Sequence, residues 1–465
     1  MTYDLIIVGA GPCGIFAAYE ARKLSPSAKI LVIDRGANIY KRTCPLGKGK
    51  VKQCPAAGCT PACSITCGFG GAGAYSDGKF NITTHFGGWL GDYMPPDKLL
   101  DMIYYVDAIN LKHGAPEEIT DPETNEVRYI ERKAYGAGLK LLRAKVRHLG
   151  TEMNLKVLQS LFDELDNKVE MIFATEVADI LIRNEKIAGI TTTDGTEYLA
   201  KNVLLAPGRN GSAWLERLLT RRGINVWCNQ VDIGVRAETS DIIMQDINDS
   251  LYEAKLLFNS STGSVVRTFC ANPSGHVVVE NYDGIMAVNG HAFHDKKLGS
   301  ENTNFALLVS HKFTRPFNKP NEYARDVCNR ANDLSDGGVM IQALGDIRRG
   351  RRSTRHRIEE GFLTPTLKEA VPGDLGLVLP YNTMKSLLEM TDALDKVTPG
   401  FASEHTLFYG VEAKFYSARP DLDENLQIKE IPGLYCGGDG AGTTRGLAQA
   451  GVAGVHVARA VFREN

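Results

Sequence analysis

The sequence predicts an α/β fold in which a second, mixed α+β part is inserted into the first. Three observations support this prediction. Residues 1–36 read as an apolar strand, a glycine turn, a small-residue helix and a second strand. Residues 226–398 instead contain strand-like segments separated by turns, with two helical stretches. Residues 433–465 return to a strand that runs into a glycine turn and a helix, so the first part closes at the C-terminus.

The composition is that of an ordinary soluble protein. The chain has 465 residues, of which 43% are hydrophobic, and this is enough for two substantial cores. A formal net charge of −2 gives no general reason to expect nucleic acid or an anionic membrane as a partner. No basic leader precedes the first strand, and no apolar run approaches the roughly 18 residues of a membrane helix. We expect a cytoplasmic protein without a membrane span.

The first strand, residues 3–8, leads into the turn Gly9-Ala10-Gly11-Pro12-Cys13-Gly14. In a strand–GxGxxG–helix unit the first glycine allows the tight turn, the second lets backbone amides approach a pyrophosphate, and the third lets helix and strand pack closely. The helix N-terminus then faces the anion. Asp34 follows about 20 residues later, where a carboxylate holds a ribose hydroxyl, and we expect Arg35 to cover the adenine. The segment predicts a dinucleotide-binding unit.

The remaining elements of the first part follow from hydrophobic period and turn residues. A helical segment at 98–166 precedes a stretch of strands, and the turn Asp194-Gly195 closes a small antiparallel meander. The predicted helices are 98–113, 139–148 and 154–165; the turn 121–125 is followed by a short strand or loop; the predicted strands are 171–174, 178–182, 187–192 and 202–206. The last strand ends at Pro207-Gly208, which returns the chain to the dinucleotide site.

The inserted part has a different order of predicted strands and helices. Its predicted strands are 231–236, 265–270, 277–281 and 285–289, and its predicted helices are 323–332 and 382–395; the C-terminal helix of the first part is 447–462. We therefore divide the chain into a discontinuous dinucleotide-binding domain, 1–225 with 399–465, and a substrate domain, 226–398. A cysteine-rich loop at 44–79 belongs to the first domain.

Two glycine turns at opposite ends of one chain suit a long ligand that is contacted along its length, and FAD fits this better than NAD. Together with the first turn, Leu204-Leu205-Ala206-Pro207-Gly208 and Cys436-Gly437-Gly438-Asp439-Gly440 resemble the glutathione-reductase-type flavoproteins. The resemblance implies a glutathione-reductase-like FAD-binding Rossmann domain. It also implies that Asp439 hydrogen-bonds the ribityl chain and that the residues 446–448 lie beside the flavin ring.

Four further segments resemble the FAD-dependent dehydrogenases often labelled "NAD-utilizing" or NAD(P)/FAD-dependent oxidoreductases. They are GFGGAGAYSDGK (68–79), VRTFC (266–270), TLFYGVE (406–412) and GDGAG (438–442), so the resemblance covers nearly the whole chain. It implies that the loop 70–79 lies over the isoalloxazine. The residues expected to bind FAD are Gly9, Gly11, Pro12, Cys13, Gly14, Asp34, Arg35, Gly70, Gly71, Gly73, Ser76, Val177, Pro207, Gly208, Gly438, Asp439, Gly446, Leu447 and Ala448.

A second strand–GxGxxG–helix unit is missing from the sequence. The pyridine-nucleotide disulfide reductases carry one for NAD(P)H, and none follows Val226. The turn Gly208-Arg209-Asn210-Gly211 lacks the required spacing. We therefore expect no dedicated nicotinamide domain, with NAD(P)H at most a transient donor.

Half of the ten cysteines lie between Cys44 and Cys67. The spacing Cys54-x4-Cys59-x3-Cys63-x3-Cys67 supplies four soft thiolates, the number for a [4Fe–4S] centre, with Cys44 as an alternate ligand. It matches neither the bacterial ferredoxin run nor the paired CxxC of a zinc ribbon. Structural zinc, a redox-active dithiol and unligated thiols therefore stay open. An iron–sulfur centre beside a flavin would serve one-electron donors such as a ferredoxin-like protein.

One dense basic run, residues 348–357, stands out. It suits an anionic substrate, a phosphate or RNA, or is a solvated loop with partners among Asp346, Glu359 and Glu360. No aromatic residues interleave the arginines, which disfavours nucleic acid.

The catalytic residues are the least explicit part of the sequence. The candidates are His276, His291 and His294 in the inserted part, and Lys79, Lys414, Tyr416 and Arg419 near the family-like motifs. Taken together, the sequence predicts an FAD-dependent oxidoreductase, a dehydrogenase or reductase that exchanges hydride or electrons with a small anionic or unsaturated substrate. The alternatives are an RNA-modifying flavoprotein, a redox sensor or electron-transfer subunit, and a flavin monooxygenase.

Overall fold

The computed structural model describes residues 1–45, 48–50, 59–60, 62–76, 78–251, 254–282, 284–292, 296–314 and 316–462. They form two compact units. The first unit contains Met1–Thr120, Ala144–Cys228 and Ser417–Asn465, and the second contains Asp121–Arg143 and Asn229–Tyr416. Residues 399–416 lie in the second unit because they contain the strand Leu407–Lys414, which pairs with two other strands of that unit.

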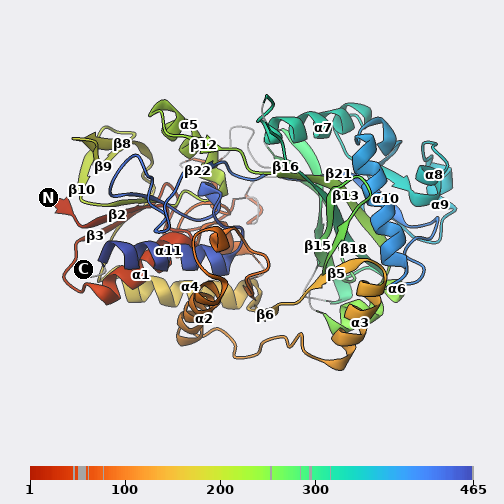
Figure 1. Ribbon diagram of the computed structural model, residues 1–465, viewed down its shortest axis with the longest axis horizontal. Helices are drawn as coiled ribbons and strands as arrows, with labels where there is room; N and C mark the ends of the chain where they lie inside the picture. Colours follow the sequence, from red (N-terminus) through yellow and green to blue (C-terminus); the bar gives the residue numbers. More distant parts are fainter. Residues whose placement is uncertain are drawn as a thin grey trace. The chain divides into compact units, whose positions relative to one another are not determined.

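A five-stranded parallel sheet lies at the centre of the first unit (Figure 1). Its order is β23 (Leu434–Cys436), β11 (Val203–Leu205), β2 (Leu5–Val8), β3 (Ile30–Ile33) and β7 (Glu170–Ile172). All pairs are parallel, and every residue of the first four strands is buried. Because both faces of such a sheet are covered, its strands read as unbroken apolar runs. This is the predicted Rossmann-type domain.

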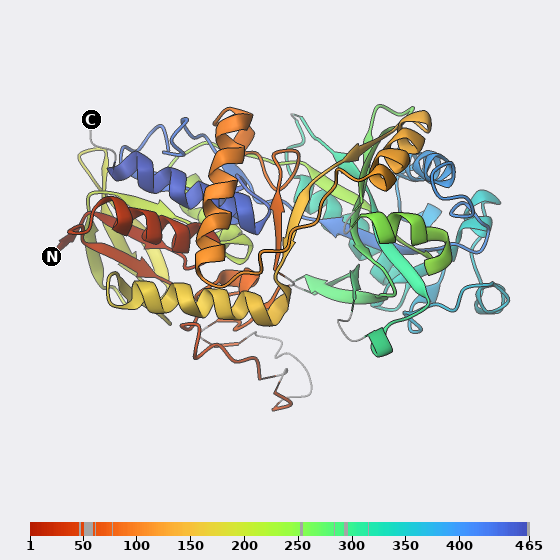
Figure 2. The same ribbon diagram turned by 90° about the horizontal axis from the view of Figure 1, so that it is seen from below.

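Helices α1 (Pro12–Leu24) and α11 (Leu447–Phe462) lie side by side against this sheet (Figures 1 and 2). They approach so closely that a Cβ at Gly454 would lie only 2.0 Å from the carbonyl oxygen of Cys13. The absence of a side chain at Gly454 permits this contact. The other elements of the first unit are α2 (Pro96–Lys112), α4 (Gly150–Asp166), α5 (Ser212–Arg221), the sheet β1 (Thr2–Tyr3), β10 (Glu197–Ala200), β9 (Lys186–Thr192), β8 (Val177–Arg183), and the pairs β4 (Lys79–Ile82) with β6 (Lys145–His148) and β12 (Val226–Trp227) with β22 (Arg419–Pro420).

The second unit is built on an eight-stranded sheet. Its order is β20 (Val371–Pro372), β19 (Met340–Ala343), β21 (Leu407–Lys414), β13 (Val231–Ser240), β18 (Asn302–His311), β15 (Val265–Asn272), β14 (Lys255–Asn259) and β5 (Leu139–Leu142). All pairs are antiparallel except β19 with β20. Its helices are α3 (Asn125–Gly136), α6 (Asp241–Ser250), α7 (Pro320–Leu334), α8 (Leu344–Arg348), α9 (Arg355–Glu359) and α10 (Tyr381–Asp395), and β16 (His276–Tyr282) pairs with β17 (Ile285–His291) as a hairpin.

The two faces of this sheet differ in chemistry. On β13 the side chains of Val231, Ile233 and Val235 join a core with residues of α3, α6, α7 and α10, the helices on one side of the sheet in Figure 1. The alternate residues Asp232 and Arg236 are also fully buried, although they face the other way. We call this second side the polar face.

Two sequence predictions were wrong. Residues 139–148, predicted as a helix, form strands β5 and β6, because β5 pairs with β14 and alternates buried and exposed positions. Residues 125–136, predicted as a strand or loop, form α3. The Thr124 side chain accepts a hydrogen bond from the Val127 amide at 3.2 Å, so the turn residues before it are the start signal of a helix.

In the part of the chain that the structure describes, none of the helices has the length and hydropathy needed to cross a bilayer.

Candidate functional site

The glycine turn between β2 and α1 is shaped by backbone contacts. A Cβ at Gly9, where φ is +109°, would lie 2.1 Å from the carbonyl oxygen of Ala206, and one at Gly14 would lie 1.9 Å from that of Gly9. Only glycine fits at these two positions. Gly11 differs, because the nearest atom to a Cβ there would be the Cα of Gly71 at 3.9 Å. The backbone is therefore open to a ligand at Gly11.

The N-terminus of α1 begins at this open position. Its N-cap is Gly11, which supplies no side-chain hydrogen bond, and no acidic residue occupies the first turn. The first N–H groups of a helix have no partner within the helix, and together with the helix dipole they attract an anion. A pyrophosphate matches this arrangement.

Glycine-rich segments from distant parts of the sequence meet at the same place. A Cβ at Gly71 would lie 3.1 Å from the Cα of Gly11, and one at Gly73 would lie 2.6 Å from the Cδ2 of Leu447. A Cβ at Gly438 would lie 3.2 Å from the Cβ of Cys13. We call these segments, residues 9–14, 70–73, 438–440 and the start of α11, the cradle.

The loop that contains the cradle residues 70–73 is fixed by two side chains that bond to the Gly73 carbonyl group. The carbonyl oxygen of Gly73 accepts hydrogen bonds from Ser76 Oγ and Asn154 Nδ2, both at 2.7 Å. The amide of Gly70 donates to the carbonyl oxygen of Ala10 at 2.8 Å, which ties the loop to the first glycine turn. The Ser76 hydroxyl thus positions this loop by bonding to the backbone of Gly73.

Asp34, which the sequence predicts as the residue that binds a ribose hydroxyl, holds three backbone segments together. Its carboxylate accepts hydrogen bonds from the amides of Ala10 at 2.8 Å, Gly36 at 2.7 Å and Gly68 at 2.9 Å. A carboxylate has about four acceptor positions, so one is left for a ligand hydroxyl. Arg35 beside it lies 3.8 Å from the Glu176 carboxylate.

The C-terminal part of the cradle is organised around Asp439. Its Oδ1 accepts a hydrogen bond from Thr444 Oγ1 at 2.7 Å, while Arg209 Nε lies 3.8 Å from Oδ2. A Cβ at Gly440 would lie 2.2 Å from the carbonyl oxygen of Gly208, so this turn and the end of β11 touch through their backbones. Val177, by contrast, is buried in the core at the start of β8.

The sequence reasoning missed the segment 86–89. The Arg445 amide donates to the carbonyl oxygen of Gly87 at 2.8 Å, and the Trp89 amide donates to that of Thr443 at 2.9 Å, so this segment borders the start of α11. Gln449 Nε2 bonds the carbonyl oxygen of Phe86 at 3.1 Å, and its buried Oε1 has no hydrogen-bond partner among the described residues. The adjacent glycines 87 and 88 were the available signal.

Two cysteines of the first unit are packing residues. Burial raises the pKa of Cys13 to about 12, and a Cβ at Gly437 would lie 2.9 Å from its Sγ. Burial also raises the pKa of Cys436. Both thiols therefore stay protonated at neutral pH and fill space between strand, turn and helix.

The predicted metal ligands are only partly within the described residues, since Cys54 lies outside them. Cys63 and Cys67 share one turn, in which the Cys67 amide donates to the carbonyl oxygen of Cys63 at 2.9 Å. Burial opposes ionisation of Cys63, but hydrogen bonds from Thr66 and the backbone, with the Arg42 charge, bring its pKa below the ordinary value. Within the described ranges no group of three or more His, Cys, Asp or Glu side chains is arranged to hold a metal ion.

Arg42 holds the segment that follows the cysteines. Its buried guanidinium donates to the carbonyl oxygens of Ser64 at 3.0 Å, Ile65 at 2.8 Å and Phe69 at 2.7 Å. It also lies 5.0 Å from the centre of the Tyr75 ring. The loop between the cysteines and the cradle is therefore built around one cation.

The predicted catalytic residues are dispersed. Arg419 in the first unit lies 2.7 Å from the Asp92 carboxylate and over the Trp89 ring, and Lys79 lies on β4 in register with His148. In the second unit His276 bonds the carbonyl oxygen of Leu298 at 3.0 Å, His291 is exposed at the end of β17, and Tyr416 donates to Asp232. His294 lies outside the described residues.

A buried ionic network covers the polar face. Arg236 forms a two-pronged pair with Glu412, at 2.8 and 3.0 Å, and donates to Asn304 Oδ1 at 2.9 Å. Lys414 contacts the same Glu412 carboxylate at 2.9 Å. Burial opposes ionisation of Glu412, but these cations hold its pKa below the usual range.

Asp232 is the second centre of the polar face. Its carboxylate accepts hydrogen bonds from Ser310 Oγ at 2.7 Å, from the Tyr416 hydroxyl and from the guanidinium of Arg267. Among the described residues, Tyr416 and Lys414 are thus the predicted catalytic residues that lie within buried polar clusters, Tyr416 with Asp232 and Lys414 with Glu412.

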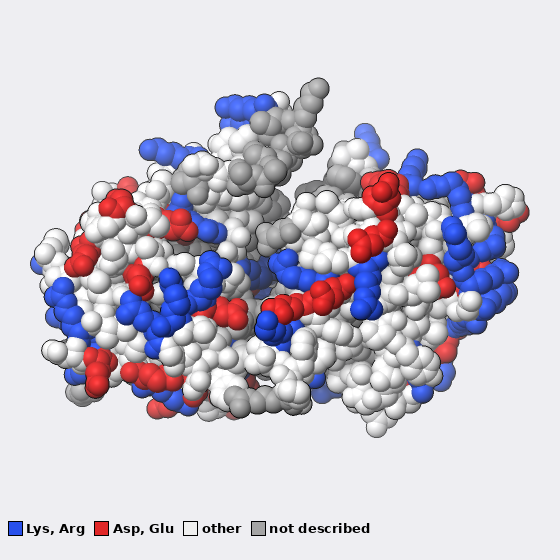
Figure 3. Space-filling model, turned by 90° about the horizontal axis from the view of Figure 1, so that it is seen from above, with Lys and Arg blue, Asp and Glu red and all other residues white. Residues whose placement is uncertain are grey.

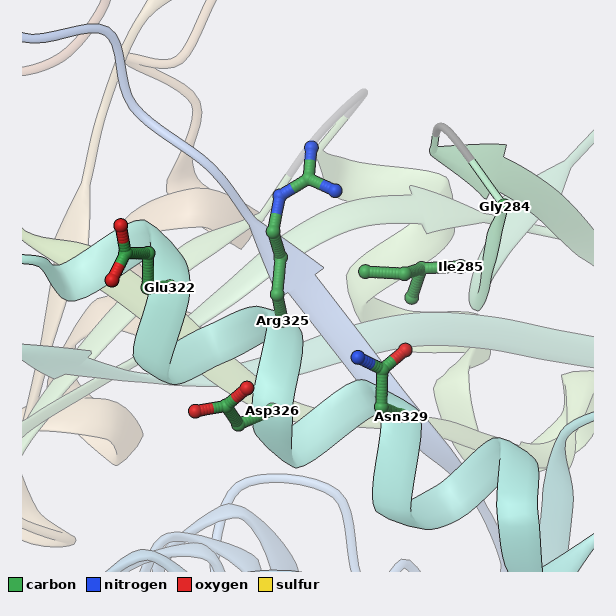
Figure 4. A pocket seen from close by; sticks show the side chains of 6 residues that line it. All are labelled: Gly284, Ile285, Glu322, Arg325, Asp326 and Asn329. Carbon is green, nitrogen blue, oxygen red and sulfur yellow. The ribbon is translucent and has the colours of Figure 1, made fainter.

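Two features of the protein surface lack a buried polar cluster of the kind found on the polar face. An open hollow of about 500 Å³ lies between the start of β17 and α7. Figure 4 shows its lining side chains, with Arg325 extending from α7. Its lining residues Glu322, Asp326 and Asn329 are exposed surface side chains. None of the residues predicted for the site lines it.

The basic run 348–357 lies at α8 and α9, where Lys and Arg side chains gather in Figure 3. Several of its arginines have carboxylate partners: Arg348 with Asp392, Arg349 with Glu404, and Arg351 and Arg357 with Asp346. Asp346 is one of the three partners, with Glu359 and Glu360, that the sequence suggested for a solvated loop.

Two segments of the chain match known protein families. Residues 3–213 match the pyridine nucleotide-disulphide oxidoreductase family, and residues 233–415 match the family described as FAD-dependent protein, C-terminal domain-like. A Clostridium beijerinckii protein described as "Uncharacterized protein" is 26% identical over 495 residues, covering 99% of this chain and 80% of that one.

Two solved structures illustrate the wider similarity. Pyridoxine 4-oxidase from Mesorbium loti is 11% identical with a TM-score of 0.44 and covers 99% of both chains. Glycine oxidase from Geobacillus kaustophilus is 14% identical with a TM-score of 0.39, covering 100% of this chain and 95% of that one.

The cradle and the two family matches define the class of protein: an FAD-dependent oxidoreductase. Its N-terminal part matches the pyridine nucleotide-disulphide oxidoreductase family, and its inserted part matches the FAD-dependent C-terminal domain family. The predicted resemblance and the predicted FAD are thereby confirmed, whereas the iron–sulfur centre and NAD(P)H stay predictions.

Proposed function

We propose that the protein is a dehydrogenase or reductase that exchanges hydride or electrons with a small anionic or unsaturated substrate. Bound FAD supplies the two-electron chemistry, and the chain positions the substrate and excludes competing reactions. The observation that best supports this is the cradle, where three distant glycine-rich segments meet at an open helix N-terminus. The polar face of the second unit supports a polar substrate.

We further propose that the electrons come from a separate donor, either NAD(P)H bound in passing or a ferredoxin-like protein. The second unit supports this, because its main sheet is largely antiparallel and does not follow the parallel pattern of a nicotinamide-binding domain. The donor would therefore bind to a surface and leave after each turnover.

The cysteine loop is proposed as an auxiliary redox centre, with Cys59, Cys63 and Cys67 joined by Cys54. The buried Arg42 cation favours the thiolate form of Cys63, since its own hydrogen-bond partners are neutral carbonyl groups and a buried cation needs a counter-charge. Iron and sulfide analysis of protein purified without oxygen tests this. About four irons per chain support a cluster, and protein without iron that retains FAD rejects it.

Anaerobic turnover tests the proposed activity. The FAD-loaded protein is mixed with small organic acids and their unsaturated counterparts, and the flavin absorbance is followed with NADH, NADPH or reduced ferredoxin as donor. Substrate-dependent flavin reduction or reoxidation without oxygen supports the proposal. Turnover only under air, with hydroxylated product, would indicate a monooxygenase. Salt-sensitive RNA retention without small-molecule turnover would indicate the RNA-acting alternative.

A further inference from the structure

The polar face pairs three cations, Arg236, Lys414 and Arg267, with two buried carboxylates, Glu412 and Asp232. One carboxylate, Glu412, serves two cations, Arg236 and Lys414, and their side chains are at most 9% exposed. The next carboxylate along β13, Glu238, accepts hydrogen bonds from Thr366 at 2.5 Å, and burial raises its pKa, so it offsets little of this charge. Buried cations need a counter-charge.

Arg267 on β15 brings further donors to the same face. Its Nη2 donates to Asp232 and Tyr416, whereas its buried Nε has no partner in the described part of the chain. A guanidinium has five N–H donors in a planar fork that matches a carboxylate. Because 26% of the side chain is exposed, a small ligand can reach it.

The strand register brings the Arg267 and Lys414 side chains to one end of the polar face. Lys414 on β21 is the register partner of Asp232 on β13, and neighbouring strands lie about 4.8 Å apart. The Arg267 guanidinium reaches the same Asp232 from β15. The β16–β17 hairpin covers the other end, since a Cβ at Gly290 would lie 2.2 Å from Arg236 Nη1.

The unpartnered Arg267 Nε is therefore the observation that points to a ligand at this end. Buried polar groups in folded proteins nearly always have partners, and an N–H donor of a guanidinium is matched by an acceptor such as a carboxylate oxygen. Asn304 Nδ2 is also buried without a partner among the described residues, but it lies with Arg236 at the end that the hairpin covers.

We propose that this end of the polar face is a carboxylate-binding subsite in which Arg267 and Lys414 hold the carboxylate of a small organic acid beside the Tyr416 hydroxyl. The inference rests on the proposed function and narrows its substrate to a carboxylate. The acid group compensates the excess positive charge of the face and accepts a hydrogen bond from Arg267 Nε, which has no partner in the described part of the chain.

Calorimetric titration of malonate into the full-length, FAD-loaded protein tests the subsite. Malonate is a simple dicarboxylate probe with no reducible double bond. We expect it to bind to the wild type, and we expect Arg267→Gln to weaken that binding about tenfold or more, because hydrogen bonds between charged groups are lost. Arg352→Gln, which removes an exposed arginine of the basic run, is the matched control and should leave binding unchanged.

FAD content and the unfolding midpoint are measured for each variant. If Arg267→Gln does not fold, Lys414→Gln is the second variant, and it too should bind malonate more weakly than the control. The subsite is refuted if malonate gives no binding heat at about 10 mM, if inorganic phosphate binds and malonate does not, or if the folded variant binds like the wild type. A protein that holds FAD but not malonate overturns this inference alone, whereas one that holds no FAD overturns the proposed function.

Discussion

The Asp34 carboxylate accepts a hydrogen bond from the amide of Gly68 at 2.9 Å, and Gly68 directly follows Cys67. The same carboxylate holds the amide of Ala10 in the dinucleotide turn. A Cβ at Gly36 would lie 2.3 Å from the Gly68 nitrogen, so these backbones are in contact. The end of the cysteine loop and the FAD cradle are therefore parts of one framework.

Replacing Asp34 by Asn should lower the affinity for FAD about tenfold or more. The amide group puts N–H donors where backbone amides now donate, so at least one charge-assisted hydrogen bond is lost. Flavin fluorescence titration of the apoprotein measures the dissociation constant. Asp166→Asn, on the exposed end of α4, is the control. Equal affinity of Asp34→Asn and wild type would show that the carboxylate does not organise the cradle.

Gly14→Ala should abolish stable FAD binding and destabilise the protein by about 2 kcal/mol, because the new Cβ would lie 1.9 Å from a carbonyl oxygen. Gly136→Ala is the matched control. A Cβ at that position, the last residue of α3, meets nothing within 4 Å, and the change should stabilise the helix by up to about 1 kcal/mol. Flavin content and urea unfolding separate the two. A Gly14→Ala protein that retains FAD would contradict the packing described here.

His311 should make the stability of the second unit depend on pH. Burial lowers the pKa of its imidazole, which the charge of Asp232 only partly offsets. Its stabilising contribution is therefore complete above the unfolded pKa of about 6.5 and is lost as the pH falls through the lower folded pKa. Urea unfolding at a series of pH values should show a smaller acid-side loss for His311→Gln than for the wild type. His356→Gln, on the exposed surface of α9, should keep the wild-type profile.

The cradle was predictable because its signals are local. The strand, the glycine turn and the small-residue helix are contiguous in residues 1–36, and the helix 447–462 was predicted with the bounds that the structure has. The strands in residues 139–148 were not predictable, because the apolar residues there fit the period of a helix as well as that of a strand. The pairing of β5 with β14, over a hundred residues away in the sequence, decides between the two.

The polar face was hidden for a different reason. On β13 charged residues alternate with apolar ones, which in a sequence indicates one solvent-exposed face. The structure buries both faces, and Asp232 and Arg236 have no exposed surface. Tyr416 and Lys414 were singled out, but Arg267 was noticed only as part of a family-like segment, since its partners lie on other strands.

The most direct test of the account is the flavin content and anaerobic reduction of the purified full-length protein. We predict about one FAD per chain, released on denaturation without a covalent link, that two electrons from dithionite reduce fully. A protein that contains no flavin, and that binds none when FAD is added to the refolded chain, would contradict the assignment of the cradle.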